Sequence, residues 1–153
     1  MIALDGQSAL SPFRLERLNA RLDALHRGTR VQACWFVYFI DTAAEPAGEQ
    51  RTRLLEALEA KDSKPELASL WIVPRLGTIS PWSSKATDIA HQCGLDVVER
   101  IERGTAYRID GLDATSLALG TLAALLHDRM TETVLDSLGA AEVLFHEARP
   151  QPL

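Results

Sequence analysis

A run of eight apolar residues, "ACWFVYFI" at 33–40, constrains the fold of this chain more than any other segment. Its aromatic and β-branched side chains favour a strand, and successive side chains of a strand point to opposite faces of a sheet. Because both sets of side chains are apolar, both faces of the sheet have to be covered at this strand. A second apolar segment, "ASLWIVP" at 68–74, predicts another buried strand, and the apolar start at 1–4 predicts a third.

Helical spacing of apolar residues predicts helices between these strands. The first is expected at 12–26, with Ser11 as the N-cap, Pro12 in the first helical position and Gly28 just past the end. A second is expected at 49–60. A third begins within "ISPW" and ends at a glycine, so that helices and strands alternate along the first two thirds of the chain.

The remainder of the chain is less regular. Apolar residues between 95 and 110 share one parity, which predicts a half-exposed strand or a hairpin that turns at Arg103 and Gly104. The last third is expected to be helical, with segments at 114–128, 132–138 and 140–145. The ending "EARPQPL" holds two prolines, so 1–146 is expected to be one domain and 147–153 the start of an interdomain linker.

One pattern occurs twice. "LSPF" at 10–13 and "ISPW" at 79–82 each follow a short strand and open a helix that stops at a glycine before another strand. The spacing of 69 residues predicts two duplicated strand-helix-strand-helix units. Such units form an α+β fold with a mainly antiparallel four-stranded sheet and helices on one face, close to a ferredoxin-like fold. The other face of the central strands would then be free to meet a partner.

Composition narrows the class of protein. With 153 residues, 46% hydrophobic residues and a net charge of −5, the chain is expected to be soluble and cytoplasmic, and neither nucleic acid nor a membrane is expected as a partner. The only cysteines, Cys34 and Cys93, are expected to be buried and reduced. No glycine-rich phosphate loop, clustered metal ligands or nucleophile-base pair is found, so we assign no catalytic residue, metal site or cofactor.

The best candidate for a functional site is "RLGTISPWSSKATDIAHQCG" at 75–94. It places hydroxyl groups and a lysine at the start of a helix, where free backbone N–H groups attract phosphates and carboxylates. The hydroxyls could instead cap the helix. Trp82 favours contact with a partner, because a tryptophan in a polar loop is costly to leave in water. "SSK" at 83–85 has no counterpart in the first copy of the pattern, where "RLE" stands at 14–16.

A second candidate is "LLHDRMTET" at 125–133, a charged group of residues at the end of an apolar helix. It could be a solvated helix junction or an interdomain contact.

These motifs resemble those of a known family. The motifs are "SALSPFRLERLNARL" at 8–22, "PRLGTISPWSSKATDIAHQCGL" at 74–95, "IERGTAYRI" at 101–109 and "LHDRMTET" at 126–133. In this order they resemble the N-terminal domain of large-type phosphoribosylformylglycinamidine synthase, also called formylglycinamide ribonucleotide amidotransferase. The resemblance covers nearly the whole chain. It implies a fold similar to a dimer of the small subunit found in the multi-subunit form of the enzyme.

The resemblance also implies a function. The family converts formylglycinamide ribonucleotide to formylglycinamidine ribonucleotide in purine biosynthesis, with ATP, Mg²⁺ and glutamine as ammonia donor. The synthetase and glutaminase regions that bind these compounds are absent from this chain. It is therefore expected to be an inactive accessory domain without a cofactor of its own, which packs on those regions, supports ammonia transfer and borders the substrate. Its bare sheet face also favours self-association when isolated.

From the motifs we predict which residues contact the substrate or dock on other domains. The primary candidates are Arg75, Thr78, Ser80, Trp82, Ser83, Ser84 and Lys85. Secondary interdomain contacts are Arg103, His127 and Arg129. The alternative hypothesis is a stand-alone ferredoxin-like regulatory module that binds a small anion or an amino acid.

Overall fold

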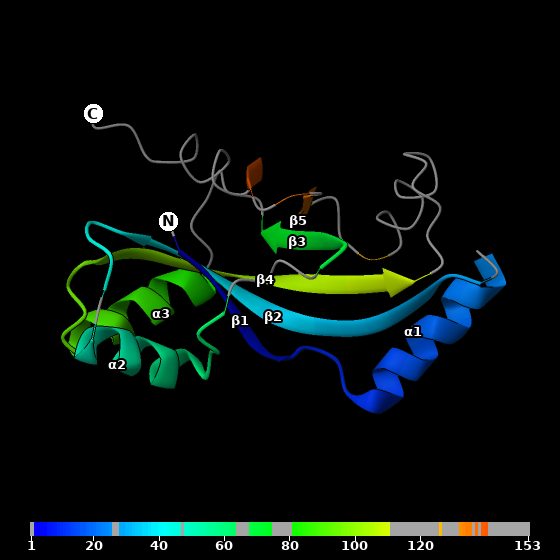
Figure 1. Ribbon diagram of the computed structural model, residues 1–153, viewed down its shortest axis with the longest axis horizontal. Helices are drawn as coiled ribbons and strands as arrows, with labels where there is room; N and C mark the ends of the chain where they lie inside the picture. The colour runs from blue at the N-terminus through cyan, green and yellow to red at the C-terminus, as the bar shows by residue number, and fades with distance from the viewer. Residues whose placement is uncertain are drawn as a thin grey trace.

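The computed structural model describes residues 2–25, 28–46, 48–63, 68–74, 81–110, 126, 132–135, 137 and 139–140. In these parts of the chain strands and helices alternate up to the last two strands (Figure 1). The elements are β1 (Ile2–Ser8), α1 (Pro12–Leu25), β2 (Arg30–Thr42), α2 (Glu49–Leu58), β3 (Leu70–Pro74), α3 (Pro81–Gln92), β4 (Val98–Asp110) and β5 (Glu132–Leu135).

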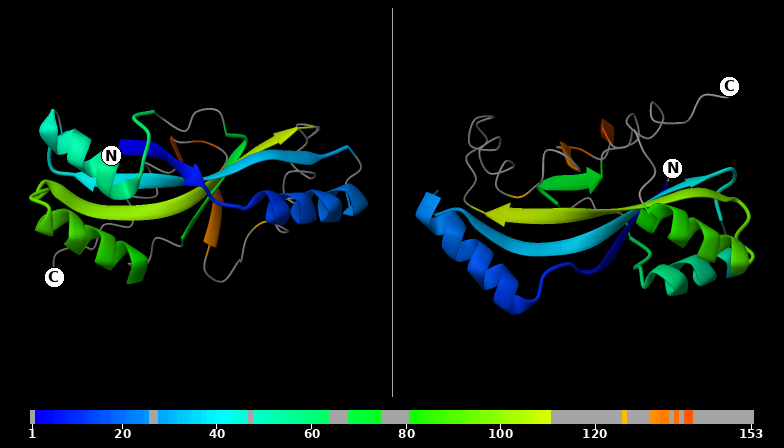
Figure 2. Two further views of the ribbon diagram at one scale, coloured as in Figure 1. Left: turned by 90° about the horizontal axis from the view of Figure 1, so that it is seen from below. Right: turned by 180° about the vertical axis from the view of Figure 1, so that it is seen from behind.

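The strands form one antiparallel sheet in the order β1-β2-β4-β3-β5. The two long strands β2 and β4 are its centre and pair along their whole lengths. Helices α1, α2 and α3 lie on one side of these strands, with α1 at one end and α2 beside α3 at the other (Figures 1 and 2). The predicted α+β class, the antiparallel sheet and the helices on one face are confirmed, but the described sheet has five strands instead of four.

Both faces of β2 are buried, as its apolar run predicts, so the expectation that one face of the central strands is free to meet a partner is wrong. Toward the helices, Tyr38 and Ile40 join a cluster that includes Leu54 of α2 and Ala90 of α3, while Val31 and Cys34 join a separate cluster around Leu22 of α1. Toward the other side, β2 packs with β3, β4 and β5 side chains. The members of this third cluster are Val37, Phe39, Trp71, Val73, Ala106 and Leu135.

Of the two alternatives predicted between 95 and 110, the strand is confirmed and the hairpin is wrong, since β4 runs without a turn through Arg103 and Gly104. Gly104 is required for a reason other than a turn. A Cβ at position 104 would lie 2.7 Å from the backbone oxygen of Ile72 and 3.0 Å from Val73 Cγ1. Gly104 therefore permits β3 to lie close against β4. The strand was predicted to be half exposed, but residues on both faces of β4 are buried.

The predicted helix at 132–138 is also wrong, because its first four residues form β5. They pair with β3, with Trp71 opposite Leu135 and Val73 opposite Thr133. The free edge of β3 supplies backbone partners that helix propensity does not take into account. The strand predicted at 1–4 extends to Ser8. The helix predicted at 114–128, apart from residue 126, and the linker at 147–153 lie outside the described residues, as does most of the turn predicted at 140–145.

The duplication stays a prediction. In the sheet, β1 pairs with β2, β2 with β4, and β4 with β3. Helix α1 connects β1 to β2 in the sequence, and α3 connects β3 to β4 in the same way. The segment expected to complete the second unit lies outside the described residues. No helix in the described part of the chain has the length and apolar character needed to cross a membrane.

Candidate functional site

The first turn of α3 points its predicted site residues in two directions. Ser83 is fully buried and Trp82 is partly buried, whereas Ser84 and Lys85 are exposed. Helical periodicity separates neighbouring side chains by about 100°, so the "SSK" motif cannot present all its groups to one ligand. Ser84 and Lys85 are therefore the members of the motif that a partner can reach. Of the other predicted residues, Arg75, Thr78, Ser80, His127 and Arg129 lie outside the described residues.

Helix α3 is held on β4 by its own polar side chains. Within the described part of the chain, β4 pairs with β3 at 105–107, and no described strand lies beside its first residues on that side. The Ile101 N–H donates to Thr87 Oγ1 at 3.2 Å, and His91 Nε2 lies 2.6 Å from the Val98 carbonyl oxygen. These contacts hold the middle and the last turn of α3 against the first half of β4.

Arg103 lies in a stack of aromatic rings at this place. Its guanidinium carbon is 4.4 Å from the centre of the Phe36 ring and 4.8 Å from that of Trp82. Tyr38, which pairs with Arg103 across β2 and β4, stacks on Trp82 with 6.0 Å between ring centres. The structure thus brings together Trp82 and Arg103, two predicted residues that are far apart in the sequence.

The electrostatics of the stack leave Arg103 able to bind an anion. No carboxylate in the described part of the chain forms an ion pair with it. Burial raises the pKa of the Tyr38 phenol, and the positive charge of Arg103 partly offsets this, so Tyr38 is neutral near pH 7. A guanidinium held between rings keeps its N–H donors in one plane, the geometry that suits a carboxylate or a phosphate.

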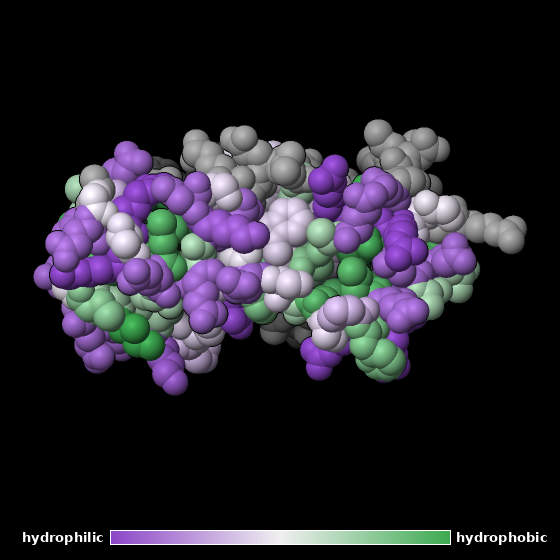
Figure 3. All heavy atoms as spheres, turned by 60° about the horizontal axis from the view of Figure 1, so that its bottom comes forward, coloured by the Kyte–Doolittle hydropathy of each residue, from purple (hydrophilic) through white to green (hydrophobic). Residues whose placement is uncertain are grey.

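An apolar groove of about 330 Å³ adjoins the stack, between α2 and α3. Leu58 and Ile89 line it together with Trp82 and Lys85. Ile89 is 45% exposed, which is unusual for a large aliphatic side chain. On this side of the molecule apolar residues reach the surface among hydrophilic ones (Figure 3). We call Trp82, Ser84, Lys85, Ile89 and Arg103 together the α3 surface.

The cysteines do not add a catalytic group. Burial raises the pKa of the Cys34 thiol to about 11, so it is not a thiolate near pH 7. Cys93 is exposed, contrary to the prediction, because Gly94 turns the chain and Leu95 takes the next buried position after Ala90. Among the described residues, no group of three or more His, Cys, Asp or Glu side chains is arranged to hold a metal ion.

Sequence reasoning missed Phe36 and Tyr38 as parts of the site. Both belong to the apolar run at 33–40, where they looked like core residues only. Their role depends on the register that sets Tyr38 opposite Arg103, which no local pattern reveals.

Comparison with known families identifies the domain. The family model described as "Formylglycinamide ribonucleotide amidotransferase N-terminal" matches residues 35–145, which is more than half of the chain. The match includes β4, the part of β2 from Trp35 onward and every residue of the α3 surface. The chain therefore belongs to the family of N-terminal domains of formylglycinamide ribonucleotide amidotransferase.

Proposed function

We propose that this chain is the N-terminal accessory domain of a phosphoribosylformylglycinamidine synthase, and that its α3 surface docks on the synthetase and glutaminase regions of the same polypeptide. That ligase converts formylglycinamide ribonucleotide to formylglycinamidine ribonucleotide with ATP, Mg²⁺ and glutamine. The substrates and the ions would bind in those other regions. The docked domain would support the passage of ammonia between them.

The observation that carries this proposal is the stack of Arg103 between Phe36 and Trp82. Arginine and tryptophan are enriched among residues that dominate the binding energy of protein interfaces. The guanidinium is already ordered by its two rings, so binding a carboxylate of another domain would cost little additional side-chain entropy.

The surroundings of the stack favour docking over direct contact with the nucleotide. The adjoining groove is apolar, with Leu58 and Ile89 in its lining. An apolar side chain of a neighbouring domain would fill such a groove, whereas a ribonucleotide would need polar partners there. Ser84 and Lys85 then lie where they can take the polar rim of an interface.

The test is the double substitution Ser84→Ala and Lys85→Ala in the full-length amidotransferase. We expect the glutamine-dependent rate to fall about tenfold, as for loss of a moderate interface contact, and the rate with free ammonia to change much less. Arg21→Ala is the matched control, since it removes an exposed positive charge from α1. Circular dichroism of the 153-residue domain checks that the variants fold.

Two outcomes contradict the proposal. If both rates stay unchanged, the exposed residues of the motif serve only the start of the helix. If both rates fall equally, the surface contacts the substrate and not a neighbouring domain.

A further inference from the structure

A second pocket lies away from the α3 surface, where β1 separates from β2. The register between these strands shifts between Asp5 and Ser8, so β1 carries one extra residue there. β2, the start of α1, the segment 61–63 and Arg108 of β4 complete its walls. The pocket has a volume of about 520 Å³, within the range of roughly 300–1,000 Å³ of small-molecule sites.

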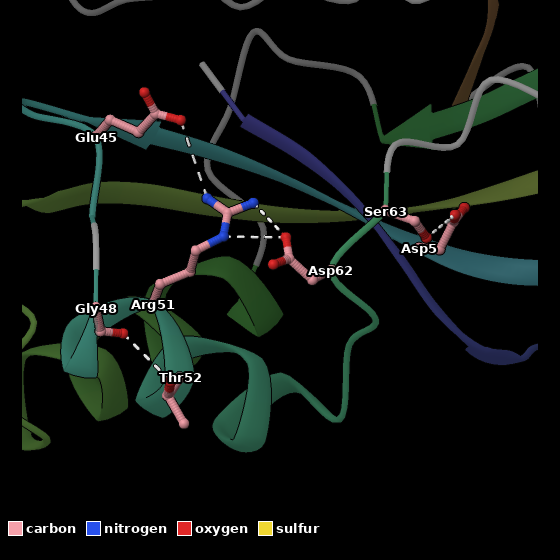
Figure 4. Close-up of polar contacts among 7 residues, drawn as sticks. All are labelled: Asp5, Glu45, Gly48, Arg51, Thr52, Asp62 and Ser63. Carbon is pink, nitrogen blue, oxygen red and sulfur yellow. Dashed lines mark hydrogen bonds and ion pairs between the residues drawn. The ribbon is translucent and has the colours of Figure 1, made fainter.

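The wall formed by the segment 61–63 is held at both ends. The Lys61 N–H donates to the Asp5 carbonyl at 2.7 Å, and the Asp5 N–H donates to the Ser63 carbonyl at 3.0 Å. On the other side, Arg51 of α2 donates from Nε to Asp62 Oδ1 at 3.0 Å, and this hydrogen bond lowers the pKa of the Asp62 carboxyl. Figure 4 shows the Arg51–Asp62 contact and a further side-chain contact between Ser63 and Asp5. The backbone that carries Lys61 is therefore fixed before any ligand binds.

Asp5, the one carboxylate among the described residues of the lining, already has hydrogen-bond partners on both oxygens. Asp5 accepts a hydrogen bond from Trp35 Nε1 at 2.8 Å on one oxygen and from Ser63 Oγ at 2.6 Å on the other. It therefore orients the Trp35 ring and the segment 61–63, and it offers little to a cationic ligand.

Two cations in the pocket have no such partner. Lys61 and Arg108 both line it, both are exposed, and neither forms an ion pair with any other described residue. With Asp5, the described residues of the lining carry a net charge of +1, in a chain whose net charge is −5. A positive pocket in an acidic protein attracts anions and gives them donors for charge-assisted hydrogen bonds.

The rest of the lining is apolar or neutral. Trp35, Leu10, Leu15 and Ala33 present carbon surface. Cys34 adds a thiol that burial keeps protonated, so covalent chemistry is not expected. The ligand therefore has to combine an anionic group with an apolar body.

We propose that the β1–β2 pocket binds a small organic anion, with Lys61 and Arg108 holding its carboxylate or phosphate and Trp35 with Leu15 contacting its apolar part. This inference is independent of the docking proposal, because the α3 surface contributes no residue to the pocket.

The test titrates the ¹⁵N-labelled chain with benzoate, phenyl phosphate and, as the cationic counterpart, benzylamine. The chain has three tryptophans, at 35, 71 and 82, and each gives one indole N–H signal that can be assigned by substitution with phenylalanine. We expect a saturable shift of the Trp35 signal with benzoate or phenyl phosphate, no saturation with benzylamine, and unchanged signals of Trp71 and Trp82.

The double variant Lys61→Ala, Arg108→Ala should weaken binding more than about tenfold, as loss of hydrogen bonds to a charged group predicts. Arg21→Ala, which removes an exposed cation that is not part of the described lining, should leave it unchanged. The buried Trp71 reports whether each variant is folded, since its signal should stay in place.

Three results would overturn the proposal: saturation by neither anion, equal affinity for benzylamine, or equal affinity of the double variant and the unsubstituted chain. A shift at Trp82 in place of Trp35 would also overturn it, because it would locate the anion at the α3 surface.

Discussion

The stack around Arg103 makes a quantitative prediction for the isolated chain. Its guanidinium contacts two rings, at 4.4 Å from Phe36 and 4.8 Å from Trp82. Each cation–π contact at a partly exposed site contributes about 0.5–1 kcal/mol. Since no ion pair is lost with it, Arg103→Ala should lower the free energy of unfolding by about 1–2 kcal/mol.

A double-mutant cycle isolates the part of this energy that belongs to Trp82. Urea unfolding of the unsubstituted chain, Arg103→Ala, Trp82→Ala and the double variant should give a coupling energy of about 0.5–1 kcal/mol. Arg103→Lys should lose most of what Arg103→Ala loses, because lysine keeps the charge but cannot stack as a planar group.

A control cycle combines Arg103→Ala with Phe13→Ala in place of Trp82→Ala. Phe13 is 66% exposed on α1. Distant sites add within about 0.3–0.5 kcal/mol. If the cycle with Trp82 shows no more coupling than the control cycle, the stack does not form in solution and the docking proposal loses its main support.

Two further predictions concern the fold. Gly104→Ala should destabilise the domain by about 1–3 kcal/mol, because its Cβ would overlap the Ile72 oxygen. Gly139→Ala, whose Cβ would meet no described atom within 4 Å, should leave the melting temperature nearly unchanged. Equal melting temperatures of the two variants would refute the close approach of β3. Since burial raises the Cys34 pKa from 9.0 to about 11, the unfolded chain loses this proton first, and the free energy of unfolding should fall as the pH rises from about 9 to 11. Cys34→Ala should flatten that fall in urea titrations, and a slope as steep as that of the unsubstituted chain would contradict the assignment.

Local patterns predicted the elements whose causes are local. Ser11 does cap α1, accepting from the Arg14 N–H at 3.2 Å, and Gly28 has the positive φ of 89° expected after a helix. The structures of β4 and β5 depend instead on contacts with residues that are distant in the sequence. Gly104 looked like a turn residue, although it is required by β3, and 132–135 is a strand because β3 offers it an edge.

The residues of the site could likewise be predicted only where a local sequence pattern marks them. Trp82 and Lys85 stand out as unusual residues at a helix start, so sequence reasoning found them. The division between buried Ser83 and exposed Ser84 depends on the phase of α3 against β4. The aromatic partner Phe36 of Arg103 could not be found, because only the strand register brings the two together.

The central claim, that the α3 surface docks on other regions of the amidotransferase, can be tested most directly by chemical labelling of lysines. The chain has lysines only at 61, 64 and 85, and Lys85 is exposed in the isolated domain. Acetylation rates measured by mass spectrometry should show Lys85 reacting readily in the 153-residue chain and more slowly in the full-length enzyme, because a lysine at the rim of an interface is partly covered by the neighbouring domain. Equal reactivity of Lys85 in both proteins would contradict docking through this surface.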